Sequence, residues 1–109
     1  MITSRPSRVA FQKRQWYRLH KLYLALKASG LKVKKDYHCV SVVTYEKPEW
    51  EKAKMGETVQ QSLAINWTDE YGYVWYPDMN DVTNQNRQSS FKVSTVVSRF
   101  KSYVILEVH

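Results

Sequence analysis

Acidic residues are missing from the first third of this chain. The first 35 residues contain ten lysines and arginines and no aspartate or glutamate, whereas all ten acids and the other seven bases follow from Asp36 onward. The formal charge of +7 therefore divides into +10 on the first 35 residues and −3 on the rest. Because clustered positive charge attracts polyanions, we expect a partner that carries negative charge.

Cysteine and glycine are also scarce, and each scarcity excludes a class of site. The single cysteine, Cys39, excludes an intramolecular disulfide and makes a reducing compartment the simpler expectation. One cysteine and three scattered histidines give no zinc-ligand spacing. Three glycines in all form neither of the common glycine-rich phosphate loops. We therefore expect no metal and no cofactor.

Long hydrophobic runs are absent as well. No apolar stretch approaches the roughly 18 residues that span a membrane, and the N-terminus lacks the apolar core of a secretory signal. With 43% apolar and 14% aromatic residues, the 109-residue chain has the composition of one folded domain rather than of a disordered protein. We expect a single soluble intracellular domain over residues 1–109, in the cytoplasm, nucleoid or nucleus.

A basic amphipathic helix is predicted near the N-terminus. Residues 1–7 are expected to form a basic arm, with Ser7 capping the helix and Gly30 ending it. At helical spacing, apolar side chains share one face and basic side chains occupy much of the remaining surface. The apolar face comprises Phe11, Trp16, Leu19, Leu22, Tyr23 and Leu26.

Three β-strands are predicted from runs of β-branched and aromatic residues at 36–46, 58–67 and 71–76. A charged connector at 47–57 follows the first strand. The polar, asparagine-rich segment at 78–90 follows the third strand and is predicted to be a loop.

A second helix and a final strand complete the prediction. Val93, Val96, Val97 and Phe100 recur at helical spacing, and residues 103–108 have the composition of a strand. The element order α-β-β-β-α-β predicts an α+β domain with a three- or four-stranded antiparallel sheet and both helices on one face. The last strand could lie parallel to a neighbour, which would make the sheet mixed.

The hairpin between the second and third strands suggests an aromatic row. In the preferred register Trp67 opposes Gly72, so that Tyr71, Tyr73 and Trp75 lie on the face away from the helices. Exposed aromatic side chains on a sheet can stack on the bases of a single strand. The same row could instead form a protein contact or a second packed cluster. A one-residue slip of the register would exchange the two faces.

These features predict a small basic nucleic-acid-binding domain that is not an enzyme. Tyr73 and Trp75 are its candidate stacking residues, and reversing the charge of Arg14 and Arg18 is expected to abolish binding. DNA and RNA are equally compatible with the sequence. The candidate phosphate contacts are Arg5, Arg8, Lys13, Arg14, Arg18, Lys21, Lys32, Lys34 and Lys35.

An alternative is a protein-binding regulator, of the kind that viruses and mobile elements encode, which covers an acidic surface of its partner. Two further alternatives are a small ribonuclease with His20 or a tyrosine as the acid–base group and a helix that lies on a membrane surface.

His38 and Cys39 are neighbours in a predicted strand, so their side chains are expected to point to opposite faces of the sheet. This orientation excludes a simple Cys–His catalytic pair within the strand.

Overall fold

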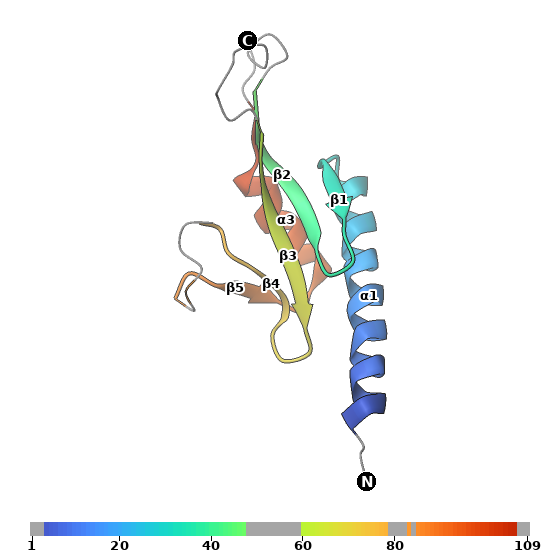
Figure 1. The fold of residues 1–109 in the computed structure, drawn as a ribbon. Helices are drawn as coiled ribbons and strands as arrows, with labels where there is room; N and C mark the ends of the chain where they lie inside the picture. Colours follow the sequence, from blue (N-terminus) through green and yellow to red (C-terminus); the bar gives the residue numbers. More distant parts are fainter. Residues whose placement is uncertain (1–3, 48–59, 79–82, 84, 107–109) are drawn as a thin grey trace.

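The computed structural model describes residues 4–47, 60–78, 83 and 85–106, with side chains from Arg8 to Val104 within those ranges. Those residues form two helices and a six-stranded sheet (Figure 1). The elements in chain order are α1 (Ser4–Ala28), β1 (Val33–Lys35), β2 (Val40–Glu46), β3 (Gln60–Thr68), β4 (Gly72–Trp75), β5 (Gln88–Ser90), α3 (Val93–Tyr103) and β6 (Ile105–Leu106).

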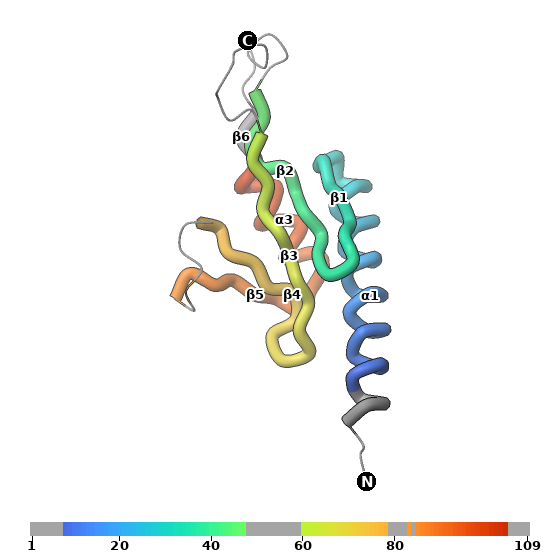
Figure 2. Tube along the Cα trace, in the orientation of Figure 1, coloured from blue at the N-terminus to red at the C-terminus, as the bar shows by residue number. Residues whose placement is uncertain are grey.

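Five of the strands form an antiparallel meander in the order β1-β2-β3-β4-β5. The short β6 lies parallel to β2, with Ile105 opposite Tyr45. Figure 2 follows the Cα trace through β1 to β5. The predicted α+β class is confirmed, but the expected three or four strands are too few. The additional strands β1 and β5 contain three residues each, which is too short for an alternating hydrophobic pattern to reveal.

The hydrophobic core lies between the two helices and one face of the sheet. Alternate residues of β2 and β3 point into it, because strand side chains alternate between the two faces. Figure 1 shows α3 against the sheet and α1 running alongside β1. The buried residues are Leu19, Leu22 and Leu26 of α1, Val40 and Val42 of β2, Leu63, Ile65 and Trp67 of β3, Tyr73 and Trp75 of β4, and Val96 and Phe100 of α3.

The two ends of α1 differ in how well the sequence predicts them. The helix begins at Ser4, one turn before the cap expected at Ser7. Its C-terminal end is as predicted, because Gly30 adopts a φ of 88° and Leu31 N–H donates to the carbonyl of Leu26 at 3.3 Å. Gly30 N–H donates to the carbonyl of Lys27, which completes the usual glycine-terminated helix end.

The strand predicted at 36–46 begins at Val40 instead. Residues 36–39 form the turn between β1 and β2, in which Asp36 N–H donates to the carbonyl of Cys39 at 2.8 Å. His38 and Cys39 therefore lie in a turn, and the strand-based argument about their orientation was wrong. Most of the predicted connector at 47–57 lies outside the described residues, and the polar segment at 78–90 contains β5.

The register predicted for the β3–β4 hairpin is wrong by one residue. Trp67 pairs with Tyr73, and Thr68 pairs with Gly72, so three residues form the loop. Gly72 makes this loop length feasible, because its φ of 80° lies in the left-handed region that other residues rarely adopt. Thr68 Oγ1 also accepts a hydrogen bond from Tyr71 N–H at 3.0 Å. The slip moves Tyr73 and Trp75 from the outer face to the core.

Candidate nucleic-acid interface on α1

Four of the predicted phosphate contacts are exposed and form no ion pair with a described acid, namely Arg8, Lys13, Lys21 and Lys34. Arg5 lies in the first turn of α1, but its side chain is outside the described part of the structure. The acid-free sequence of α1 thus places several unpaired cations on one helix, where they can approach an anion without a competing carboxylate on the same element.

Arg14 is already bound to a carboxylate. Its Nε donates to Asp69 Oδ1 at 3.2 Å and its Nη2 to Asp69 Oδ2 at 2.5 Å, across the gap between α1 and the tip of the β3–β4 hairpin. These hydrogen bonds raise the pKa of Arg14 and lower the pKa of Asp69. Asp69 also accepts a hydrogen bond from Trp67 Nε1. The pair offsets the charge of Arg14 and occupies two of its donors, so Arg14 is less available to a phosphate than an unpaired arginine.

Arg18 and Lys32 are engaged as well. The guanidinium of Arg18 lies 5.1 Å from the centre of the Trp67 ring, and Lys32 forms an ion pair with Glu46. Reversing the charges of Arg14 and Arg18, the test suggested by the sequence, would therefore disturb contacts between α1 and the β3–β4 hairpin. Lys13 and Lys21 are the better residues for testing a phosphate-binding surface.

Strand alternation separates Lys34 from Lys35. Lys35 pairs with Val40, whose side chain is buried beneath the helices, whereas Lys34 pairs with Ser41. Lys35 therefore lies on the helix side of the sheet and Lys34 on the opposite side. The lysines at positions 32–35 do not form one continuous extension of the α1 surface, as the sequence had suggested.

Tyr73 and Trp75 are not available for stacking. Tyr73 is fully buried and Trp75 is 2% exposed. Tyr73 Oη donates to the carbonyl of Arg18 at 2.7 Å, and burial raises the pKa of Tyr73 although the nearby Arg18 opposes the shift. Tyr71, the third member of the predicted row, keeps 36% exposure, and the guanidinium carbon of Arg87 lies 4.1 Å from the centre of its ring. The predicted aromatic row therefore does not exist.

A different aromatic series lies on α1. The rings of Trp16 and His20 stack with centroids 4.9 Å apart, and Tyr23 follows at 6.4 Å from His20. Lysine ammonium groups lie over both ends of the series: Lys35 Nζ is 4.7 Å from the Trp16 ring centre, and Lys27 Nζ is 5.8 Å from that of Tyr23. His20, the residue considered as an acid–base group, is part of this stack.

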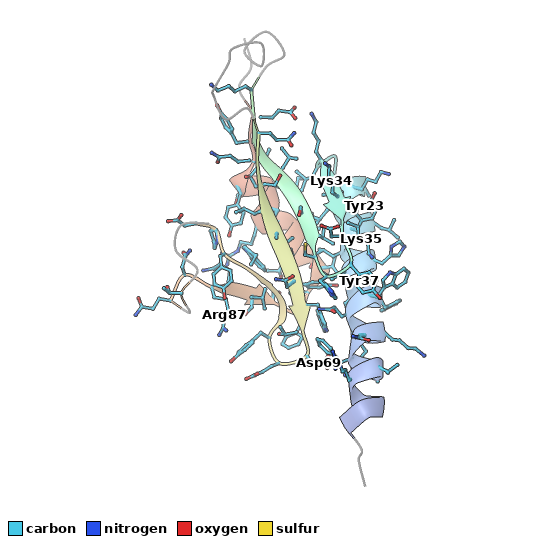
Figure 3. The ribbon with its side chains drawn as sticks, viewed as in Figure 1. Tyr23, Lys34, Lys35, Tyr37, Asp69 and Arg87 are labelled. Carbon is cyan, nitrogen blue, oxygen red and sulfur yellow. The ribbon has the colours of Figure 1, made fainter. Side chains whose placement is uncertain are left out.

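Trp16 and Tyr37 border an open pocket of about 280 Å³. Tyr37 comes from the turn between β1 and β2 and is 79% exposed, and Trp16 is 52% exposed. Figure 3 labels Tyr37, Lys35 and Tyr23 on the side of the molecule where α1 and β1 lie. We call this feature the aromatic pocket, and its lining residues are Val9, Gln12, Lys13, Gln15, Trp16 and Tyr37.

Sequence reasoning missed both aromatic members of this pocket. Trp16 was placed on the apolar face of the helix, but the core uses Leu19, Leu22 and Leu26 and leaves Trp16 at its border. Tyr37 was placed in a strand, whereas it lies in a turn. A signal was present for Trp16, since Gln12 and Gln15 flank it on a face that was expected to be apolar.

Across the described ranges, no group of three or more His, Cys, Asp or Glu side chains is arranged to hold a metal ion. Neither helix in that part of the chain is both long and apolar enough to cross a membrane. Comparison with protein-family models, with curated proteins and with solved structures gives no match to this chain.

Proposed function

We propose that this protein is a nucleic-acid-binding domain that contacts the phosphate backbone through α1. The observation that carries the proposal is the set of exposed, unpaired cations on a helix without a single acidic residue, above all Lys13 and Lys21. Exposed faces of helices normally combine both signs of charge, since oppositely charged residues four positions apart stabilise the helix. A helix face whose charged residues are all lysine or arginine lacks these stabilising ion pairs, and its positive charge attracts anions.

Salt dependence is the physical signature of such an interface. Each lysine or arginine that neutralises a phosphate releases condensed counterions, so the affinity falls as the salt concentration rises. These contacts carry no sequence information by themselves, because phosphates are the same at every position. We therefore expect binding to many sequences through this surface.

Replacing Lys13 and Lys21 together by alanine is expected to weaken binding to DNA and RNA of any sequence. The slope of log affinity against log salt should become shallower by about 0.7–0.9 for each lost phosphate contact. Fluorescence anisotropy with labelled oligonucleotides at several salt concentrations measures both quantities. The matched control replaces Lys92 and Lys101, which are exposed at the two ends of α3, and removes the same charge. Equal losses in both variants would contradict a specific role for α1.

Replacing Asp69 by asparagine is expected to strengthen binding. The change removes the carboxylate that holds Arg14, so the guanidinium becomes available to a phosphate. The salt slope should steepen by about 0.7–0.9 if one contact is gained. Glu70→Gln is the control, because Glu70 is the exposed neighbour in the same turn and has the same charge. An equal gain from Glu70→Gln would mean that overall charge, rather than the release of Arg14, causes the effect.

An acidic protein partner is the second candidate function. Four large apolar or aromatic side chains on α1, Val9, Trp16, Tyr17 and Leu24, are 52–58% exposed. Tryptophan and tyrosine are enriched in protein interfaces, so these side chains favour such a contact more than isolated charges would. Leu24→Ser separates the two functions, because it leaves the cations in place. Loss of a protein contact with unchanged nucleic-acid affinity in this variant would favour the protein partner.

A further inference from the structure

The aromatic pocket combines exposed aromatic rings with positive charge. Its walls include the rings of Trp16, which is 52% exposed, and Tyr37, which is 79% exposed. The Trp16 ring stacks on His20 and has the Lys35 ammonium over it, whereas most of Tyr37 is open to a ligand. Positive charge surrounds these rings, because Lys13 lines the pocket and Lys35 lies over Trp16. Asp36 precedes Tyr37 in the turn, but its single negative charge is outweighed by the two lysines. The pocket thus suits a ligand with a flat apolar part and a negatively charged part.

The size and the polar groups of the pocket further limit the kinds of ligand that fit it. A volume of about 280 Å³ lies near the lower end of the range for small-molecule sites, about 300–1,000 Å³, so one flat ring system is a suitable occupant. Gln12 is exposed at the pocket and offers both an amide donor and an amide acceptor to the edge of such a ring. Gln15 is partly committed, since its Nε2 donates to the carbonyl of Trp67 at 3.4 Å.

Lys35 lies over the Trp16 ring, so a base can stack on that face of the ring only after the ammonium moves. A lysine carries a compact charge on a flexible stem of four carbons, so its ammonium can move from the Trp16 ring to a nearby phosphate. That movement would expose the ring face to a stacking partner and would keep the positive charge next to it. Tyr37 needs no such movement, because 79% of its surface is already exposed.

We propose that the aromatic pocket binds one nucleobase of a single-stranded nucleic acid, with Trp16 and Tyr37 as the stacking residues and Lys13 and Lys35 next to the flanking phosphates. This inference rests on the proposed nucleic-acid-binding function and adds a preference for single strands. The bases of a duplex are stacked on one another and cannot enter a side pocket, whereas unpaired bases can stack on aromatic side chains.

The test compares Trp16→Ala and Tyr37→Ala with Tyr17→Ala. Tyr17 is an exposed aromatic residue on the same helix that does not line the pocket, so its replacement controls for general loss of aromatic surface. The probes are labelled oligothymidylate, oligouridylate, an abasic strand of the same length and a DNA duplex, each titrated by anisotropy at two salt concentrations. Circular dichroism checks that each variant is folded. The DNA and RNA strands show which sugar the site prefers.

Trp16→Ala and Tyr37→Ala should each bind the base-containing strands about 5-fold to 150-fold more weakly, the range reported for removing one base–aromatic stack. Tyr17→Ala should bind them as the unchanged protein does. Affinity for the duplex should stay the same in all three variants, and the unchanged protein should prefer the base-containing strand to the abasic strand.

Other outcomes overturn the inference, and they separate it from the proposed function. If the unchanged protein binds strands and duplex but neither pocket variant loses affinity for the strands, the pocket site is wrong and the phosphate interface stands. Equal binding of abasic and base-containing strands has the same meaning. If the unchanged protein binds no nucleic acid even at low salt, both proposals fail. Binding of a polyglutamate peptide that depends on Trp16 and excludes oligothymidylate would replace the nucleobase with an acidic protein segment.

Discussion

Trp75→Ala should lower the free energy of unfolding by about 3–5 kcal/mol, the usual loss for a buried aromatic residue replaced by alanine. Trp75 is 2% exposed, packs edge-on against Phe100 with ring centroids 5.5 Å apart, and donates from Nε1 to Tyr103 Oη at 3.2 Å. The substitution leaves a cavity between β4 and α3 and removes this hydrogen bond. Since small domains are stable by only about 5–15 kcal/mol, this loss is a large part of the total stability of the domain.

Urea denaturation followed by circular dichroism measures this loss, and Trp16→Ala is the matched control. Trp16→Ala also replaces a tryptophan by alanine, but this tryptophan is 52% exposed, so the free energy of unfolding should fall by much less. The comparison also tests the hairpin register. In the register predicted from sequence, Trp75 would lie on the exposed face, and the two variants would be about equally stable. That result would contradict the burial of β4.

Gly72→Ala should destabilise the protein by more than φ strain alone predicts. The φ of 80° places Gly72 in the left-handed region, where a side chain costs roughly 1–2 kcal/mol. A Cβ at this position would also lie 2.7 Å from the carbonyl oxygen of Ser90 and 2.9 Å from Phe91 Cα. Both contacts are with backbone atoms, so relief requires β5 or its connection to α3 to move. We expect a total loss of about 2–5 kcal/mol.

Gly30→Ala separates the cost of the positive φ from the cost of the close contacts that an added Cβ would make. Gly30 has a similar φ of 88°, but no atom lies within 4 Å of the Cβ that the substitution would add. Its loss should therefore report the φ strain alone, about 1–2 kcal/mol. Thermal or urea denaturation of both variants gives the difference directly. Equal losses at the two glycines would show that β5 and α3 adjust freely to the hairpin, contrary to the close contact in the structure.

Elements whose local sequence decides their structure were predictable. The C-terminal end of α1 follows from Gly30, and α3 follows from the helical spacing of Val93, Val96 and Phe100. Both depend on residues within one or two turns. The turn at 36–39 was not predictable in this way, because Tyr37 has strand propensity and only pairing with neighbouring strands fixes where β2 begins.

The hairpin register required information that no single stretch of sequence contains. Loops of two, three or four residues all fit the segment from Thr68 to Gly72. Loops of two and of four residues give one register, a loop of three residues gives the other, and the register determines which side chains enter the core. The structure resolves the choice through the buried partners of Tyr73 and Trp75, which come from α1 and α3. Those contacts join residues that are distant in the chain, so they are invisible to local patterns.

The sequence located the charged residues of the candidate site, but it did not predict how their side chains are arranged. Counting residues located the cations on α1, yet it could not show that Arg14 pairs with Asp69, which lies 55 positions later. It also could not show that Tyr37 and Trp16 share one pocket, because a helix and a distant turn supply them. Composition therefore located the charged residues, while their contacts depended on the fold.

The meander order of the sheet has a consequence for how the chain folds. From β1 to β5, each antiparallel strand pairs with the strand that directly precedes or follows it among the described residues. Short-range pairing reduces the loop-closure entropy that has to be overcome before contacts form, and chains with such contacts fold faster. The slower closures include the docking of α1 on β3 and β4, the packing of α1 against α3 and the pairing of β6 with β2, which all join segments that are distant in the chain.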